Sequence, residues 1–380
     1  MTDAPVWLCP DLIFDGTLRR GMALSVENGM TTNLCARADL PDTAAVHLIS
    51  GTISPGFVDL QVNGGGDVLL NTDPTAAAML HMAKTHRRFG TIGILPTVIT
   101  DAPEILERVV EAAMAAKGGE GILGLHIEGP HISVARRGTH SARFVRPLDA
   151  VTMAQVARLR AAGVAVMITL APEAVRPGQV ADLVALGAVV SIGHSDATSQ
   201  AVQQLLAEGA SCFTHLFNAM SPMLNRAPGV TGACINSSVA AGIICDGVHV
   251  ADEMVALAIR ARPVPDTMFL VSDSMSTVGG SDRFMLYGAE IRLVDGRLVN
   301  AEGSLAGAHV TMAESLARLV RVLGVAPETA LRMAVTTPAR VIGRGDLAGI
   351  LRRRACDLVV LDGGWRVMGS LDRQLPARVA

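Results

Sequence analysis

The sequence predicts a (β/α)₈ TIM barrel joined to a small β-sandwich domain that is formed from both chain termini. Eight short apolar segments alternate with helical segments through the middle of the chain, as strands and crossover helices do in a closed barrel. The two ends differ, because they contain short strand-like segments separated by Asp-Gly, Asn-Gly and Gly-Gly turns. One α/β barrel with a small additional domain accounts for the 380 residues.

The eight candidate barrel strands are apolar runs that are interrupted by Gly, Asp or His. Parallel strands are buried on both faces, so they are apolar along their length rather than alternating. The predicted strands are residues 57–62, 91–98, 122–127, 164–170, 188–193, 211–216, 239–245 and 267–272.

Helical segments lie between most of these strands and return the chain to the start of the next one. A doubly wound open sheet is the alternative architecture, but no GxGxxG pattern follows the first strand. The predicted helices are residues 75–90, 102–118, 148–163, 177–187, 198–209 and 251–262, followed by a helical region from about 309 to 342.

The two chain ends read as one small β domain. The segments VWLCPDLIFDG, GMALSVENGMTTNL and AVHLISGTISPG resemble strands near the start, and CDLVVLD and WRVMG resemble strands near the end. We therefore expect residues 1–54 and 345–380 to form the small domain and residues 55–344 to form the catalytic barrel.

Composition narrows the function classes. A net charge of −3 argues against a general nucleic-acid binder, and no run approaches the ~20 apolar residues of a membrane helix. Aromatic residues make up only 3%, too few to line a polysaccharide groove, so a small ligand is expected. Six scattered cysteines without CxxC spacing and a start that lacks the signal-peptide pattern predict a cytoplasmic protein.

Polar residues follow five of the predicted strands, where barrel enzymes place their active sites. Five of the ten histidines lie at these ends, which favours a shared site over isolated core histidines. The residues are His126, Glu128 and His131 after the third strand, His194 and Asp196 after the fifth, His215 and Asn218 after the sixth, Asp246 and His249 after the seventh, and Asp273 after the eighth.

One Glu and two His match the ligand set of a catalytic Zn²⁺, which keeps its fourth position for water. A carboxylate at a neighbouring strand end, such as Asp273, could take a proton from that water. The strand ends therefore predict a metal-dependent hydrolase.

Four other polar residues lie near these strand ends. His126 is on the same strand face as Glu128, and both a ligand role and a hydrogen-bonding role beside the site are open. Asp196 is expected to cap the helix that begins at DATSQ. Arg136 and Arg137 lie in the long connection after the third strand. Two interpretations are open for them: they belong to a solvated loop, or they contact an anionic substrate.

Six motifs in order, HIEGPHI, RRGTH, SIGHSDA, THLFNAMSPM, GIICDGVHV and LVSDSM, together resemble the N-acetylglucosamine-6-phosphate deacetylases of the amidohydrolase superfamily. Each motif alone is weak, but six with the expected spacing are specific, and the resemblance covers most of the chain. It implies hydrolysis of the acetamide of N-acetylglucosamine 6-phosphate to acetate and glucosamine 6-phosphate.

The resemblance also implies roles for individual residues. Glu128, His194 and His215 match the metal ligands, and Asp273 matches the residue that activates water and returns a proton to the amine. His140 matches a residue that polarises the substrate carbonyl. Substrate contacts are implied for Asn218 and Ala219 (sugar), for Arg226 and His249 (phosphate, across a dimer interface), and for the loop residues Leu305, Ala306 and Gly307.

The end of the first strand departs from the superfamily pattern. A His-x-His pair commonly stands there, whereas this chain has Gln61 and Asn63. Neutral amides are poor Zn²⁺ ligands beside imidazole and carboxylate. We therefore expect one divalent metal per subunit, with Zn²⁺ favoured over other ions, and expect both amides to orient the water or Glu128 by hydrogen bonds.

The expected partners are a small sugar phosphate and a second copy of the chain, with no nucleic acid and no membrane. Two alternative functions stay open at this point. One is a related amidohydrolase that acts on another N-acetylated amino sugar or a cyclic amide, and the other is a barrel that serves as a non-catalytic scaffold.

Overall fold

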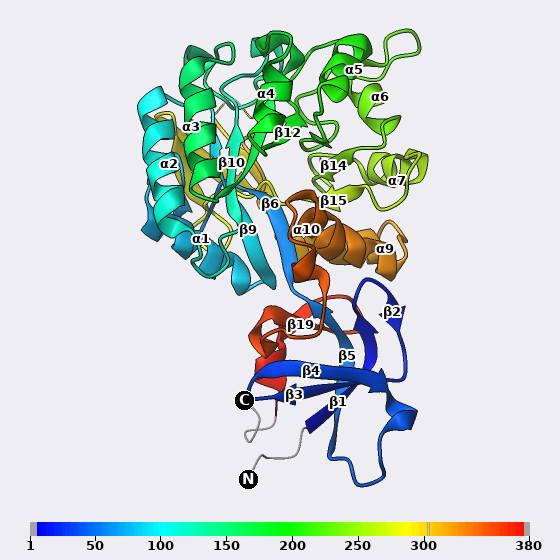
Figure 1. Cartoon of the computed structure of the whole chain (residues 1–380). Helices are drawn as coiled ribbons and strands as arrows, with labels where there is room; N and C mark the ends of the chain where they lie inside the picture. Colours follow the sequence, from blue (N-terminus) through cyan, green and yellow to red (C-terminus); the bar gives the residue numbers. More distant parts are fainter. Residues whose placement is uncertain (1–5, 302, 304, 376–380) are drawn as a thin grey trace.

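Figure 1 shows a computed structural model of the chain, which describes residues 6–301, 303 and 305–375. The barrel occupies the upper part of the view, and a sheet built from the two chain ends lies below it. The connection between them is direct, because β5 (Val46–Pro55) of the lower sheet leads into β6 (Phe57–Val62) of the barrel.

Eight parallel strands form the barrel sheet, in the order β15-β14-β13-β12-β11-β10-β9-β6. Each predicted strand overlaps one of them, so the predicted barrel is confirmed. Strand β6 is buried along its entire length, as expected of a barrel strand, and this includes its two polar residues, Asp59 and Gln61. The remaining strands are β9 (Thr91–Ile99), β10 (Gly124–Glu128), β11 (Ala165–Leu170), β12 (Val189–Ile192), β13 (Cys212–Phe213), β14 (Ala240–Ile243) and β15 (Met268–Leu270).

The first and last barrel strands meet through hydrogen bonds near their C-terminal ends. The backbone amide of Asp273 donates to the carbonyl oxygen of Gln61 at 3.0 Å. The buried carboxylate of Asp59 accepts from the backbone amides of Gln61 and Ser272, each at 3.2 Å. These contacts set the register in which the Gln61 and Asp273 side chains face each other.

Helices surround the barrel, and several begin at a Thr or Asp whose side-chain oxygen accepts a hydrogen bond from the first turn. The predicted cap Asp196 is wrong, because the hydroxyl of Thr198 accepts from the amide of Ala201 instead. Helix α6 is not among the predicted helices, since its sequence GVTGACI contains poor helix formers. The α-helices are α1 (Ala76–Arg87), α2 (Pro103–Ala116), α3 (Ala150–Ala161), α4 (Gln179–Ala185), α5 (Ser199–Ala207), α6 (Gly229–Ile235), α7 (Asp252–Ala261), α8 (Met312–Arg321), α9 (Pro327–Leu331) and α10 (Thr337–Val341).

Short helical turns complete the connections. A π-helical turn, Arg332–Thr336, joins α9 to α10. The 3₁₀ turns are Arg37–Asp39, Val134–Arg136, Ala142–Phe144, Pro172–Ala174, Gly345–Ala348, Ala355–Asp357 and Leu371–Gln374.

The two chain ends together form one small β domain, as predicted, and its strands belong to a single sheet in the part of the chain that the structure describes. In the described residues its seven strands follow the order β20-β19-β5-β1-β3-β4, with β2 paired to β1. Antiparallel pairing of β19 with β5 attaches the C-terminal segment to the N-terminal strands. The exact domain boundaries stay a prediction. The other strands are β1 (Val6–Phe14), β2 (Leu18–Arg19), β3 (Met22–Glu27), β4 (Met30–Ala36), β19 (Leu358–Leu361) and β20 (Val367–Ser370).

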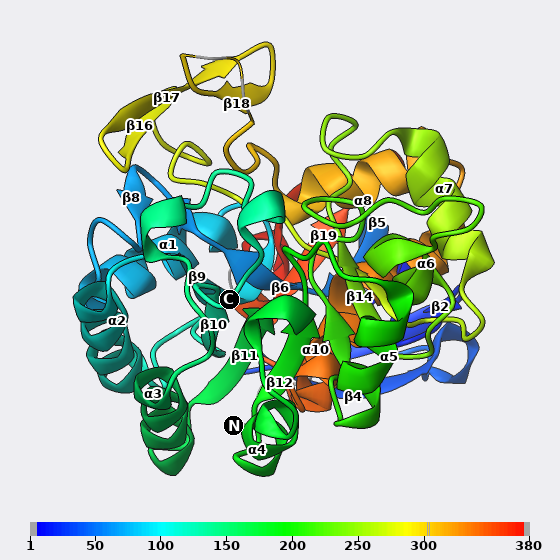
Figure 2. The same cartoon turned by 90° about the horizontal axis from the view of Figure 1, so that it is seen from above.

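A small antiparallel sheet follows the eighth barrel strand and is not among the predicted elements. It consists of β16 (Arg283–Leu286), β17 (Ala289–Val294) and β18 (Arg297–Val299). Its turns contain Tyr-Gly and Asp-Gly pairs with φ values of 51°, 82°, 49° and 76°, which suit two-residue hairpins. In the view from above, this sheet lies at the edge of the barrel, near the short hairpin of β7 (Gly64–Gly65) and β8 (Val68–Leu69) (Figure 2).

Candidate active site

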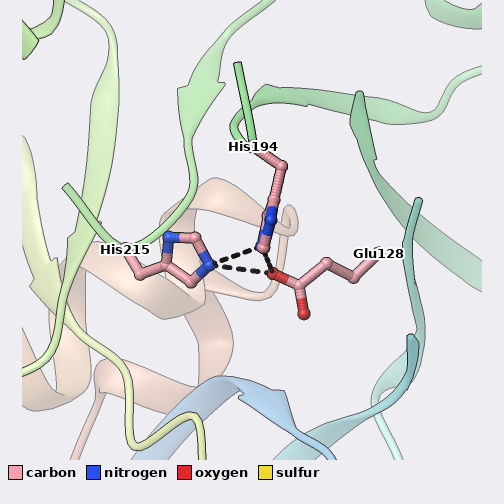
Figure 3. A group of neighbouring side chains, drawn as sticks. All are labelled: Glu128, His194 and His215. Atoms are coloured by element: carbon pink, nitrogen blue, oxygen red, sulfur yellow. Dashed lines mark hydrogen bonds and ion pairs between the residues drawn. The ribbon is translucent and has the colours of Figure 1, made fainter. Parts of the chain in front are cut away.

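Three predicted metal ligands meet at the mouth of the barrel (Figure 3). Oε1 of Glu128 lies 3.2 Å from Nε2 of His194 and 3.0 Å from Nε2 of His215. The two Nε2 atoms are 3.0 Å apart. All three side chains are buried, and their donor atoms form the one cluster among the described residues with this arrangement.

Barrel geometry brings these residues together from separate strands. Glu128 is the last residue of β10, and His194 and His215 each stand two residues beyond the end of β12 and β13. Both histidines have positive φ values, 49° and 28°. Residues other than glycine adopt this backbone only where the surrounding structure enforces it, and such positions concentrate at functional sites.

The hydrogen bonds of His194 fit a bound cation. Its Nδ1 lies 3.0 Å from the carbonyl oxygen of Arg136, which can only accept, so a neutral imidazole carries its proton on Nδ1. The lone pair of Nε2 then faces the Glu128 carboxylate and the His215 ring. A cation between these atoms would relieve the repulsion, and imidazole with carboxylate is a donor set that suits Zn²⁺.

The Glu128 carboxylate is ionised. Burial raises its pKa, but the adjacent His194 and His215 outweigh burial and hold the pKa well below its ordinary value. For His215, burial lowers the pKa, while its hydrogen bond to Glu128 and the charge of that residue raise it above its ordinary value. The Glu128 carboxylate therefore attracts a positive charge to the His215 side of the cluster, either as a proton on the ring or as a bound cation.

Two amides surround Asp273 on the opposite side of the mouth. Nδ2 of Asn63 donates to Oδ1 of Asp273 at 2.7 Å, and Nε2 of Gln61 donates to the same oxygen at 3.0 Å. Gln61 Nε2 also lies 2.9 Å from Oε1 of Glu128. Burial, followed by the negative charge of Glu128, raises the pKa of Asp273 to about 6. A carboxyl group with this pKa can both accept and donate a proton near neutral pH.

His140 lies beside the cluster, with its ring centroid 4.3 Å from that of His194. Its Nδ1 is 2.8 Å from the hydroxyl of Thr100, the residue that follows β9. Burial and then His194 hold the pKa of His140 well below its ordinary value, so the ring is neutral.

A cavity of about 170 Å³ connects these residues. Of the predicted substrate contacts, Asn218, Ala219, His249, Leu305 and Gly307 line it together with the ligands, His140 and Asp273. Ala306 is buried behind the wall, and Arg226 is exposed on a loop away from the cavity of its own chain.

Three other residues singled out in the sequence take part in local contacts. His126 lies beneath the cluster, with Nε2 2.7 Å from the hydroxyl of Thr169. His131 is bonded to the carbonyl oxygen of Arg146 and the hydroxyl of Thr152. Arg136 forms an ion pair with Asp196 at 2.7 Å.

Guanidinium Nη1 of Arg137 donates to the carbonyl oxygen of His140 at 2.9 Å. Sequence reasoning did not identify Thr100, Ile99 or Met275, although the last two line the cavity. Thr100 is a polar residue directly after the second barrel strand, so the rule applied to the other strand ends would have found it, but that rule does not select the apolar Ile99.

Among the described residues, no helix combines the length and the apolar character needed to cross a membrane.

Comparison with known proteins identifies the family of this chain. Residues 52–377 match the model of the Amidohydrolase family. The N-acetylgalactosamine-6-phosphate deacetylase of Shewanella sp. (strain ANA-3) is 38% identical, covering 94% of this chain and 92% of that protein. The N-acetylglucosamine-6-phosphate deacetylase of Haemophilus influenzae is 33% identical, covering 86% of both chains.

Solved structures agree with these relatives. The N-acetylglucosamine-6-phosphate deacetylase of Pasteurella multocida superposes with a TM-score of 0.88 at 32% identity, covering 96% of this chain and 97% of that one. A mutant of the Mycobacterium smegmatis enzyme in complex with N-acetyl-D-glucosamine-6-phosphate has a TM-score of 0.85 at 31% identity, with the same coverage. This chain therefore belongs to the amidohydrolase family, among its N-acetylglucosamine-6-phosphate deacetylases.

Proposed function

We propose that this protein hydrolyses N-acetyl-D-glucosamine 6-phosphate to D-glucosamine 6-phosphate and acetate, in amino-sugar catabolism. The observation that carries the proposal is the convergence of Glu128, His194 and His215 beside Asp273 in one cavity. A non-catalytic scaffold has no need for a ligand cluster and a proton carrier in the same place.

The proposal includes one divalent ion per subunit, held by Glu128, His194 and His215, with Zn²⁺ as the ion. When bound, the ion supplies Lewis-acid chemistry that acidifies water and polarises a carbonyl oxygen. The amides of Gln61 and Asn63 direct N–H groups at carboxylates, and an N–H donor cannot ligate a cation. This supports one ion rather than two, and mass-spectrometric metal analysis of the purified protein should find close to one per chain.

Asp273 transfers the proton in this proposal. Both amide donors reach its Oδ1, which leaves Oδ2 to exchange a proton. The carboxylate accepts a proton from the attacking water and delivers it to the amine nitrogen as the C–N bond breaks. His140 donates to the carbonyl oxygen of the acetamide, on which negative charge develops.

The remaining cavity residues bind the sugar. Asn218 and Ala219, with the loop residues Leu305 and Gly307, contact the sugar ring, while the buried Ala306 supports that loop. His249, whose Nδ1 is 2.6 Å from Oδ2 of Asp246, contacts the phosphate. Arg226 reaches the phosphate in a second copy of the chain, since its planar guanidinium suits phosphate and its exposure leaves it free to do so. The active form is then a cytoplasmic homodimer.

The name of one relative supports N-acetylgalactosamine 6-phosphate as a second candidate substrate. The Shewanella relative, at 38% identity, acts by its name on N-acetylgalactosamine 6-phosphate, which differs in the configuration at C4. The test measures acetate release from both phosphorylated epimers and from unphosphorylated N-acetylglucosamine. We expect phosphorylated N-acetylglucosamine to have the highest kcat/KM. A higher value for the galactose epimer would reassign the substrate, and equal rates with and without phosphate would contradict the phosphate contacts.

A further inference from the structure

The small sheet β16–β18 stands against the wall of the active-site cavity. Its side chains Leu286, Ile291 and Leu298 are buried in one apolar cluster with Ile99 and Met275. The last two also line the cavity. The packing of this sheet therefore reaches the substrate-binding wall directly.

A polar side chain at the tip of this sheet contacts the barrel. Tyr287, the only tyrosine of the chain, stands at the turn between β16 and β17, where its φ is 51°. Its hydroxyl donates to the backbone carbonyl oxygen of Thr100. Burial raises the pKa of the phenol above its ordinary value, so the hydroxyl keeps its proton and remains a donor.

Thr100 in turn contacts His140. Both side chains are buried, and the Thr100 hydroxyl lies 2.8 Å from Nδ1 of His140. When the hydroxyl donates to Nδ1, a neutral imidazole carries its proton on Nε2. Because Nδ1 is occupied by Thr100, Nε2 is the nitrogen that remains for the cavity that His140 lines.

We propose that Tyr287 is a positioning residue, which holds Thr100 and thereby fixes the ring and the Nε2–H tautomer of His140. The inference rests on the proposed function, in which His140 donates a hydrogen bond to the acetamide oxygen. It gives the turn between β16 and β17 a positioning role, although no residue of that sheet is among the cavity-lining residues that the structure describes.

The kinetic test removes the hydroxyl and keeps the ring. Tyr287→Phe should lower kcat about tenfold and leave KM within about twofold, as losing a supporting hydrogen bond does at other sites. Thr100→Val should lower kcat at least as much, and adding Tyr287→Phe to it should have no further effect, because both act through one hydrogen-bonded chain. Thr100→Ser keeps the hydroxyl and should retain activity.

Two results would overturn the inference. One is an unchanged kcat in Tyr287→Phe, and the other is an additive loss in the double variant. The matched control is Met285→Ala, two residues earlier on the same hairpin, where the side chain is 53% exposed. Its kcat should match that of the unmodified protein.

A second measurement does not depend on turnover. Nitrogen-15 NMR of histidine-labelled protein, with His140 assigned from the signal missing in His140→Gln, reports which ring nitrogen carries the proton. We expect Nε2–H in the unmodified protein and a mixture of tautomers in Tyr287→Phe and Thr100→Val. Nδ1–H in the unmodified protein would refute the inference. This tautomer shift in a protein that released no acetate would instead refute the proposed function alone.

Discussion

The two sides of the barrel mouth surround similar carboxylates with opposite chemistry. On the side of β10, β12 and β13, Glu128 faces the Nε2 atoms of two imidazoles, and its pKa lies well below the ordinary value. On the side of β6 and β15, Asp273 accepts hydrogen bonds from two amides, and burial followed by the charge of Glu128 raises its pKa to about 6. The same functional group therefore becomes a permanent anion on one side and a proton carrier on the other.

Gln61 connects the two sides, because its Nε2 contacts both carboxylates. A histidine at this position could provide a lone pair to a second ion. The amide group of Gln61 instead donates hydrogen bonds to the carboxylates of Glu128 and Asp273 and adds no charge of its own. The difference between the sides thus depends on whether the neighbours of each carboxylate offer lone pairs or N–H groups.

The largest effect is expected from removing a ligand. His215→Ala should abolish stoichiometric metal binding and lower kcat/KM by on the order of 10⁴, because both the Lewis acid and a ligand are lost. Metal analysis and the acetate assay together check this. Retention of one ion per chain in a variant with low activity would show that His215 is not a metal ligand.

Asp273→Asn should lower kcat by about 10³, the range of general acid–base catalysis, while the metal content stays near one. The substitution removes the proton carrier and leaves the three proposed ligands intact. Loss of the metal in this variant would show that Asp273 is itself a ligand and that the two sides are not separate.

Asn63→Leu should have a smaller effect, of roughly tenfold on kcat/KM at neutral pH. The Asn63 hydrogen bond favours ionised Asp273, so its loss raises the pKa of that carboxyl further. Because the base must be ionised to accept a proton, the acidic limb of the pH profile should move to higher pH. An unmoved limb would mean that another group controls it.

The smallest effect on activity is expected away from the mouth, where Asp357 links the terminal sheet to the barrel. Its carboxylate binds Arg354 at 2.9 Å and Arg87 at the end of α1. Burial raises the pKa of Asp357, but hydrogen bonds to Arg354 and then Arg87 outweigh burial and depress it. Asp357→Asn should cost about 2 kcal/mol of unfolding free energy and leave kcat unchanged.

The pH dependence of this contact has a definite sign. The pKa of Asp357 is lower in the folded state than in the unfolded state, where it is about 3.9. The contact therefore stabilises the fold at pH values above about 3.9, and this stabilisation is lost as the pH falls through the folded-state pKa. Denaturant titrations near pH 7 and pH 3 should therefore differ less for Asp357→Asn than for the unmodified protein. An equal pH dependence in both would exclude Asp357 as a source of acid sensitivity.

Sequence reasoning identified the barrel strands because apolar segments buried on both faces leave a clear pattern. It missed β16–β18, whose few buried side chains are separated by exposed or half-buried ones, among them the charged Arg283, Glu290 and Arg292. It also missed Tyr287, because a hydroxyl that binds a backbone carbonyl oxygen requires no particular side chain at the accepting position.

The sequence by itself indicated the strands and the residues at each strand end, which parallel barrel strands present at one mouth. Among those residues, the resemblance of the motifs selected Glu128, His194, His215 and Asp273. It also showed that amides replace histidines after the first strand. Only the tertiary structure decided that Gln61 and Asn63 both donate to Asp273, that His126 lies beneath the cluster, and that Tyr287 reaches Thr100. Those contacts depend on distances between segments far apart in the chain, which the packing of the barrel and its loops sets.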